Sequence, residues 1–223
     1  MAPMRSRRLA AAGLFALAGC LAGAVMAEGP LPSVQAGDLA QGPYAYMHML
    51  FQKTILRINV ATIEVRVDKP AQAQMASLAQ GQKYSDALAQ QLASVAIGAQ
   101  RAVVQMTFKR DVGLNRWIGV VRENLEQARK AGLISPELER RVGQGLPQWF
   151  SPLKERGYLK GDRLVYGVEP DSLRTVVVSA GGQVLVDRLE EEQGTRKVVL
   201  ASYFAPGSEF REPLLKSLFQ GSR

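Results

Sequence analysis

The sequence has one cysteine and one histidine in 223 residues. An intrachain disulfide needs two cysteines, so a fold held together by such bonds is excluded. Protein zinc sites use three or four cysteine, histidine or carboxylate ligands, and we therefore expect no metal. The histidine, His48, has no Cys-x-x-Cys-His motif beside it. We interpret it as a residue at the rim of a sheet rather than a haem ligand, and we predict no cofactor.

Motifs of nucleotide-binding and catalytic proteins are also missing. The chain contains neither a Walker loop nor G-x-G-x-x-G, and the pair Gly181-Gly182 lies between two β-prone runs, where a hairpin turn needs glycine. Residues 190–192, three consecutive glutamates, are interpreted as a solvated connection rather than a cation site. With one histidine and no nucleophile–base arrangement, we predict no catalytic residues.

Basic residues are in excess, but they do not form a patch. The formal net charge is +8, and Arg5, Arg7 and Arg8 contribute three of these charges, so +5 remains for the rest of the chain. The remaining lysines and arginines are spread out, without a basic run interleaved with aromatic residues. We therefore expect no nucleic-acid partner.

Residues 1–27 have the pattern of an export signal. A basic segment around Arg5 is followed by an apolar stretch, and the small residues before Glu28 form a cleavage site. Cleavage after Ala27 would leave a mature chain without cysteine, which suits an oxidising compartment. This interpretation places the protein in the periplasm or outside the cell.

A competing interpretation involves residues 17–20 (LAGC), which resemble a lipoprotein box. Acylation of Cys20 would then anchor the protein to a membrane of the cell envelope. We favour soluble export, because residues 21–27 remain apolar whereas a lipoprotein tether is usually polar. Residues 28–43, rich in proline and glycine, are predicted to form an extended arm over the surface of the following domain.

Several segments have the composition of β-strands. Three short β-prone runs at residues 163–168, 173–180 and 183–189 are separated by turn residues, which predicts an antiparallel meander. A further strand is predicted at residues 102–109. The long β-prone run at residues 51–67 shifts its apolar phase by one position near Ala61-Thr62, so we expect a bulge or bend there.

Other segments have helical periodicity. A weak apolar stripe predicts a helix within residues 71–100, and a strong one predicts a helix over residues 111–131. Ser135 is a candidate N-cap for a third helix, which we expect Pro147 to break or kink. Two more helical runs follow residues 190–194 and 206–208. These elements predict one α+β domain over residues 44–223, with helices covering one face of an antiparallel sheet.

A cleft between the sheet and the helices is the place where such a domain could hold a ligand. Trp117 and Asn124 are seven residues apart, so they share a helix face that is otherwise apolar. A buried asparagine needs hydrogen-bond partners. Asn124 is therefore either a ligand-binding group or is bonded to a neighbouring part of the chain, and the sequence leaves both interpretations open.

The order and spacing of four segments carry a resemblance to the bacterial chalcone isomerase-like proteins, relatives of plant chalcone isomerase and of plastid fatty-acid-binding proteins. The segments are residues 121–124 (VREN), 131–135 (AGLIS), 160–164 (KGDRL) and 197–204 (KVVLASYF). The resemblance implies an open-faced β-sandwich, in which a curved antiparallel sheet is covered on one side by helices. It extends over residues 51–219.

The resemblance does not imply the isomerase activity. The family enzymes have a tyrosine seven residues before the asparagine that corresponds to Asn124, and the residue here is Trp117, which has no hydroxyl group. A serine or threonine of the enzymes falls near Arg196, and a strand threonine falls near Asn59. Ring closure needs a stabilised enolate, and most of the groups that would stabilise it are replaced. We name Asn124, Trp117, Asn59 and Arg196 as candidate ligand-binding residues.

Three hypotheses about function follow. The first is an exported, non-catalytic protein that binds a lipophilic carboxylate, such as a fatty acid, between sheet and helices. The second is an intramolecular lyase or isomerase of the same fold with an unknown substrate, and the third is a structural, partner-binding domain of the cell envelope. A cavity with arginine or lysine at one end would favour the first, a polar cluster with a perturbed titratable group the second, and a filled core the third. The oligomeric state is left open.

Overall fold

Six antiparallel strands form a single open sheet in the computed structural model, which describes residues 39–53, 58–192 and 194–220. Each strand pairs with its neighbours in the sequence, so the order across the sheet is β1-β2-β3-β4-β5-β6. The strands are β1 (Tyr46–Lys53), β2 (Ile58–Val67), β3 (Ala102–Phe108), β4 (Arg163–Val168), β5 (Leu173–Val178) and β6 (Val184–Glu190). The predicted meander is therefore confirmed as the half of the sheet formed by β4, β5 and β6.

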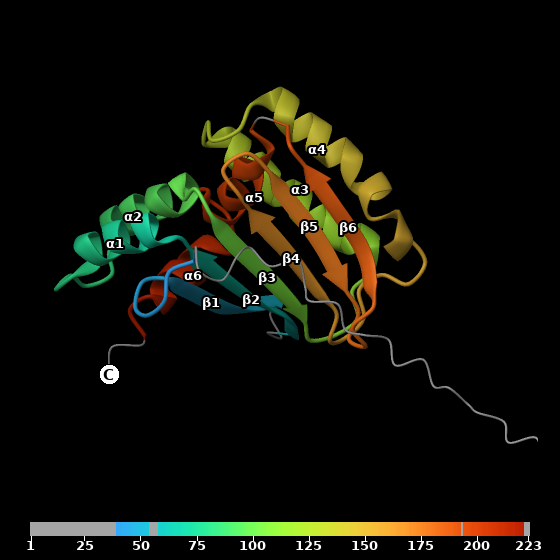
Figure 1. The fold of residues 1–223 in the computed structure, drawn as a ribbon, viewed down its shortest axis with the longest axis horizontal. Helices are drawn as coiled ribbons and strands as arrows, with labels where there is room; N and C mark the ends of the chain where they lie inside the picture. The colour runs from blue at the N-terminus through green and yellow to red at the C-terminus, as the bar shows by residue number, and fades with distance from the viewer. Residues whose placement is uncertain (1–38, 54–57, 193, 221–223) are drawn as a thin grey trace, which may run out of the picture.

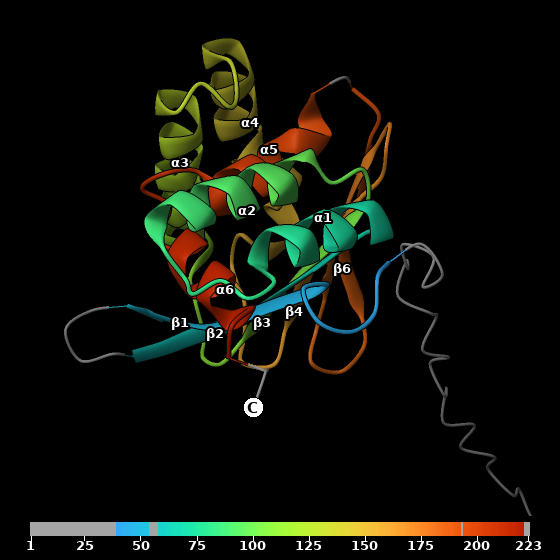
Figure 2. The same cartoon turned by 90° about the vertical axis from the view of Figure 1, so that its left-hand side faces the viewer.

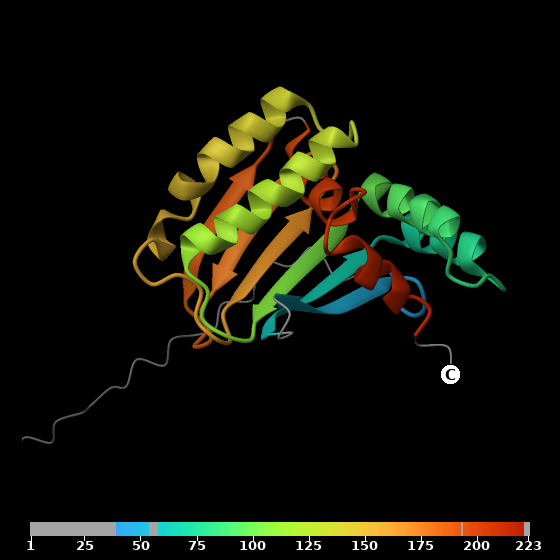
Figure 3. The same ribbon diagram turned by 180° about the vertical axis from the view of Figure 1, so that it is seen from behind.

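The helices lie on one face of this sheet (Figures 1 and 2). They are α1 (Lys69–Ala79), α2 (Asp86–Gly98), α3 (Leu114–Lys130), α4 (Pro136–Trp149), α5 (Thr195–Phe204) and α6 (Arg211–Ser217), with a 3₁₀ turn at Ser151–Leu153. Seen from behind, α3 and α4 run across the half of the sheet formed by β4 to β6 (Figure 3). Helix α3 packs against both α4 and α5, and α6 packs against β1. The predicted α+β architecture is confirmed.

Alternation along the strands places their apolar side chains under the helices. On β3, Ala102, Val104, Met106 and Phe108 are buried and the residues between them are partly exposed. On β4 and β5 both faces are largely buried. The core therefore lies between the sheet and the helices, as a two-layer architecture requires.

The β-prone run at residues 51–67 is two strands rather than one. Its first residues end β1, and the chain then returns as β2 in an antiparallel hairpin. The expected bulge is present one position earlier than predicted: Phe51 pairs with Ala61 and Gln52 with Asn59, so Val60 is the extra residue. Because a side-chain period of two cannot absorb one extra residue, the buried face changes phase at this point.

Two helix predictions need correction. The helical segment at residues 71–100 is interrupted between α1 and α2, where Gly81 has a φ of 71° and Ser85 accepts a hydrogen bond from the Leu88 amide as the N-cap of α2. Helix α4 does begin after the N-cap Ser135, but it continues through Pro147 to Trp149. Pro147 lies in the last turn of α4, where its missing backbone N–H removes one helical hydrogen bond and the helix ends two residues later.

The two ends of the described domain meet. The ring of Tyr44 lies 6.5 Å from the ring of Phe219, which also contacts Tyr84 at 5.7 Å. Leu39 and Ala40, the first described residues, are buried beside the end of β2. The predicted signal segment at residues 1–27 and most of the predicted arm lie outside the described residues. Among the helices that the structure describes, none is long and apolar enough to span a bilayer.

Candidate ligand-binding site

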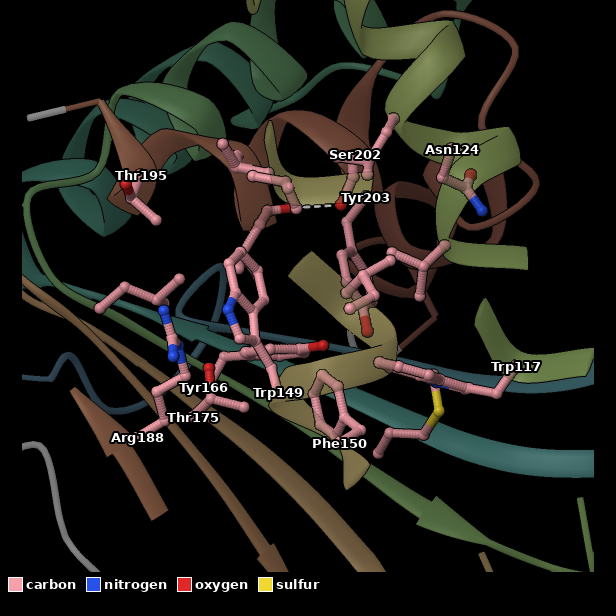
Figure 4. A pocket seen from close by; sticks show the side chains of 18 of the residues that line it. Trp117, Asn124, Trp149, Phe150, Tyr166, Thr175, Arg188, Thr195, Ser202 and Tyr203 are labelled. Atoms are coloured by element: carbon pink, nitrogen blue, oxygen red, sulfur yellow. Dashed lines mark hydrogen bonds between the residues drawn. The ribbon is translucent and has the colours of Figure 1, made fainter. Parts of the chain in front are cut away.

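A cavity lies between the sheet and the helices α3, α4 and α5 (Figure 4). We call it the aromatic cavity, because its wall includes Trp117, Trp149, Phe150, Tyr166 and Tyr203. The volume open to the centre of a water molecule is about 60 Å³. The protein's two tryptophans both belong to its wall. The cavity is thus small, and mostly apolar.

A second cavity opens beside the β1–β2 hairpin and the first turn of α3. We call it the basic cleft, because Lys53, Arg110 and Arg116 line it together with an apolar floor that includes Phe51 and Phe108. Its volume on the same measure is about 230 Å³. The cleft therefore combines an apolar interior with three cationic side chains.

The two cavities share a wall made of Met106, Trp117 and Val120. The indole of Trp117 packs edge-on against Phe150, with ring centroids 4.7 Å apart. Methionine and valine side chains complete the wall without polar groups. The two cavities therefore adjoin across apolar side chains.

The charges in the basic cleft are only partly neutralised. Lys53 donates to Glu209, with Nζ 2.9 Å from Oε2. Asp111 accepts a hydrogen bond from the Lys160 amide. Arg110 and Arg116 are exposed and, within the described part of the chain, form no ion pair. Two guanidinium groups therefore remain available to an anion.

The first turn of α3 adds to this positive potential. Its N-cap, Gly113, provides no side-chain hydrogen bond, and no acidic residue lies in the turn. The free amide groups at a helix N-terminus favour an anion. The basic cleft thus has a positive potential from the backbone as well as from side chains.

Tyr158 packs behind the shared wall. Its ring stacks on Phe108 at 4.2 Å and contacts Trp117 at 5.3 Å. Its backbone exchanges two hydrogen bonds with Val112. The preceding Gly157 has a φ of 64°, and a Cβ there would lie 2.5 Å from the Val112 carbonyl oxygen, so this close approach requires glycine.

Asp162 holds the turn that follows Tyr158. This buried carboxylate accepts hydrogen bonds from the amides of Leu159 and Ala180 and pairs with Arg156 at 2.8 Å. With so many donors the carboxylate is well compensated. The turn therefore fixes Tyr158 against the wall of the site.

Three buried phenol groups lie near one another beneath the helices. Tyr166 is on β4 and Tyr203 on α5, and Figure 4 shows their hydroxyl groups pointing toward one another. Burial raises the pKa of Tyr158, Tyr166 and Tyr203, and for Tyr158 the nearby Tyr166 and Tyr203 raise the pKa further. All three phenols are therefore neutral hydrogen-bond donors at physiological pH.

Asn124 lines the aromatic cavity, but both ends of its amide are engaged. Its nitrogen donates to the Val120 carbonyl at 2.9 Å, and its oxygen accepts a hydrogen bond of 2.7 Å from the Ser208 hydroxyl. These contacts tie α3 to the loop between α5 and α6. The amide thus already has the partners that a buried asparagine needs.

The other candidate residues lie elsewhere. Trp117 is on the wall of both cavities, as described above. Asn59 is exposed on β2 and accepts a hydrogen bond from Gln52, while its neighbours Ile58 and Val60 line the basic cleft. Arg196 donates to Gln100 on the surface. The structure thus brings Trp117 and Asn124 together at the aromatic cavity, and it places Asn59 and Arg196 outside the linings of both cavities.

The basic and phenolic residues of the site were not predicted from the sequence. Arg110 follows the end of β3, and Arg116 lies in the first turn of α3. The end of a strand and the start of the next helix adjoin, which could have predicted that the two arginines lie close together. Tyr166 lies two residues after the buried Leu164 and therefore shares its face of β4, which could have placed it inward. Tyr203 lies in an apolar helical run and carries no such signal. In the described part of the chain no group of three or more residues could hold a metal ion.

Comparisons with known proteins define the fold. Neither the protein-family models nor the curated proteins include a match to this sequence. Among solved structures, a fatty-acid binding protein of Arabidopsis thaliana superposes with a TM-score of 0.52 over 84% of this chain and 90% of its own, at 10% identity. That neighbour has the chalcone isomerase fold, and at this identity the likeness establishes the fold alone. The predicted open-faced sheet covered by helices is thereby confirmed.

Proposed function

We propose that this protein binds a lipophilic carboxylate, such as a fatty acid, between its sheet and its helices, and that it is not an enzyme. The basic cleft carries this proposal. Its cations Arg110 and Arg116 have no ion-pair partner in the described chain, and they border an apolar floor that leads toward the aromatic cavity. A carboxylate at the guanidinium groups would leave its hydrocarbon chain against that floor. The Arabidopsis fatty-acid binding protein of the same fold agrees with this ligand class.

The hydrocarbon chain would require movement of the shared wall. The aromatic cavity, at about 60 Å³, is far below the roughly 300 Å³ or more of small-molecule pockets. Displacement of the Trp117 indole or the Met106 thioether would connect it to the basic cleft. Both tryptophans line the aromatic cavity, so binding would change the intrinsic fluorescence.

The absence of catalysis is supported by the wall of the aromatic cavity. Trp117 offers no hydroxyl group, and its ring is packed against Phe150 and Tyr158. The amide of Asn124 is used within the protein. The side chains that resemble the catalytic pair of the family therefore act in packing and in connecting α3 to the chain that follows α5.

The proposal includes export. The N-terminal pattern of residues 1–27 supports delivery to the periplasm or the exterior, and LAGC at residues 17–20 is the alternative, lipid-anchored route. We also propose that the protein is bacterial, like the chalcone isomerase-like proteins that its sequence resembles.

Native mass spectrometry of the protein purified from its own envelope, followed by denaturing extraction, tests the proposal. We expect a bound lipophilic acid. The same spectrum reports whether the chain begins at Glu28 or at an acylated Cys20. Apo protein in every preparation, combined with no binding of added dodecanoate, would refute the carrier function.

A matched pair of variants tests the basic cleft. Calorimetric titration with dodecanoate should show affinity reduced about threefold to tenfold in Arg116→Ala, because a charge-assisted contact is lost at an exposed site. Arg140→Ala, an exposed arginine on α4 outside the cleft, should bind like the wild type. Equal affinities in the two variants would contradict the placement of the carboxylate.

A further inference from the structure

The wall of the aromatic cavity contains hydrogen-bond donors without acceptors. Tyr166 and Tyr203 line the cavity, and neither hydroxyl forms a hydrogen bond among the described residues. The Thr195 hydroxyl on the same wall and the Tyr158 hydroxyl behind it are fully buried, and neither has a hydrogen-bond partner within residues 39–53, 58–192 and 194–220. Tyr158, Tyr166, Thr195 and Tyr203 are each at most 9% exposed.

Unpaired donors in such a position call for an explanation. For the fully buried hydroxyls of Tyr158 and Thr195, an unsatisfied donor is costly, and native proteins rarely leave one without a reason. The hydroxyls of Tyr166 and Tyr203 instead belong to residues that line the cavity, where a ligand could supply the acceptor. Most of the other lining residues are leucine, valine and aromatic side chains, so polar groups on this wall stand out from their surroundings. The donors converge: Tyr166 reaches the cavity from the sheet and Tyr203 from the helical layer (Figure 4).

The donors are neutral and lie beyond the shared wall from the basic cleft. Arg188, the cation on the cavity wall, is engaged: its guanidinium lies 4.3 Å from the centre of the Trp149 ring and its Nε donates to Glu190 at 3.0 Å. A neutral oxygen suits phenol donors better than a second carboxylate does, because the phenols supply no positive charge. The basic cleft therefore suits the anionic head group of a ligand, and the phenols of the aromatic cavity suit a neutral oxygen that accepts hydrogen bonds.

We propose that Tyr166 and Tyr203 form a subsite for a neutral oxygen, a hydroxyl or carbonyl group carried along the chain of the ligand, so that the protein selects hydroxy or oxo fatty acids over plain ones. This inference rests on the proposed function, in which the carboxylate occupies the basic cleft. The two tyrosine hydroxyl groups donate to the ligand oxygen after the chain has passed Trp117. The Thr195 hydroxyl is a further donor on the wall of the same cavity.

The experiment compares dodecanoate with its monohydroxy and monooxo derivatives, the oxygen placed at successive carbons. Titrations of the full-length protein should identify at least one oxygenated acid that binds about twofold to tenfold more tightly than dodecanoate, the range expected for one net hydrogen bond. The Tyr166→Phe, Tyr203→Phe double variant should lose this preference and keep its affinity for dodecanoate. Tyr84→Phe, whose ring packs on Phe219 away from the cavity, should keep both.

Each other outcome overturns the inference in its own way. Equal binding of all the acids by the wild type would mean that water alone satisfies the phenols. A preference retained in the double variant would place the oxygen elsewhere. Weaker dodecanoate binding in the double variant would place the carboxylate itself at the tyrosines. Binding of none of the acids would instead refute the proposed function, and the inference with it.

Discussion

Single side chains in this protein divide into those that hold the fold and those that face a cavity. Asp162 belongs to the first kind, since it joins the turn after Tyr158 to the turn after β5 through amide donors and Arg156. Asn124 belongs to it as well. The hydroxyl groups of Tyr166 and Tyr203 belong to the second kind, because no other group in the described part of the chain accepts a hydrogen bond from them.

The first prediction concerns Asp162→Asn. The amide cannot accept as strongly from the backbone and leaves Arg156 without its partner, so we expect a loss of about 3 kcal/mol in the free energy of unfolding. Chemical denaturation measures this loss. Asp187→Asn is the matched control, because its pair with Arg174 is exposed and should contribute less than about 1 kcal/mol. Similar losses in both variants would refute the special role of Asp162.

The second prediction concerns pH and the three buried phenols. Their folded-state pKa is raised by burial above the usual value near 10. Because the pKa of each phenol is higher in the folded than in the unfolded protein, the unfolded protein loses these protons first as the pH rises above 10. The free energy of unfolding that comes from the protonated phenols is therefore fully present below pH 10 and is lost at higher pH. We therefore expect the free energy of unfolding to fall above pH 10.

Phenolate absorbance distinguishes this cause from others. In the folded protein the three buried phenols should stay protonated above pH 10, because burial raises the pKa of each. The triple phenylalanine variant at positions 158, 166 and 203 should lose most of the alkaline decline. An unchanged decline would assign it to other groups.

At the scale of elements, a close backbone contact helps to position the site. The pairing of Val112 with Tyr158 brings the start of α3 against the end of the segment that follows α4. Gly157 permits this contact through its positive φ and its missing Cβ.

The third prediction compares two glycines. Gly157→Ala should lower the free energy of unfolding by about 2 kcal/mol or more, because the left-handed backbone and the contact with the Val112 carbonyl are both strained. Gly119→Ala, inside α3 with open space around it, should raise stability by about 0.4–1 kcal/mol. Thermal and urea unfolding of both proteins provide the measurement. A neutral Gly157→Ala would show that the contact can relax.

Element positions were largely predictable, whereas of the site only the helix face with Trp117 and Asn124 was predicted. The meander, the strand at β3 and the helices α3 and α4 follow from apolar periodicity and from turn residues that act within a few positions. The β-prone run at residues 51–67 was not divided into β1 and β2, because apolar residues occur along its whole length. The basic cleft contains Lys53 of β1 and Arg116 of α3. The tertiary fold brings these residues together, and no local sequence pattern predicts that they are neighbours.

At the scale of the whole molecule, a ligand that spans both cavities would contact both the sheet and the helices and would stabilise the folded domain. The fourth prediction is a thermal shift. Dodecanoate at about a hundredfold excess over its dissociation constant should add about 2.7 kcal/mol, which corresponds to a rise in melting temperature of about 5–10 °C for a domain of this size. Acetate, which has the carboxylate without the chain, should cause no shift. Equal shifts with both acids would indicate a surface anion effect.

The meeting of Tyr44 with Phe219 has a consequence for how this domain could be combined with others. A domain whose entry and exit points adjoin can be spliced into a surface loop of a host protein without stretching either partner. Fused in that way to a reporter, the domain would transmit any ligand-induced tightening directly to the host, and the fusion would serve as a genetically encoded sensor for its ligand.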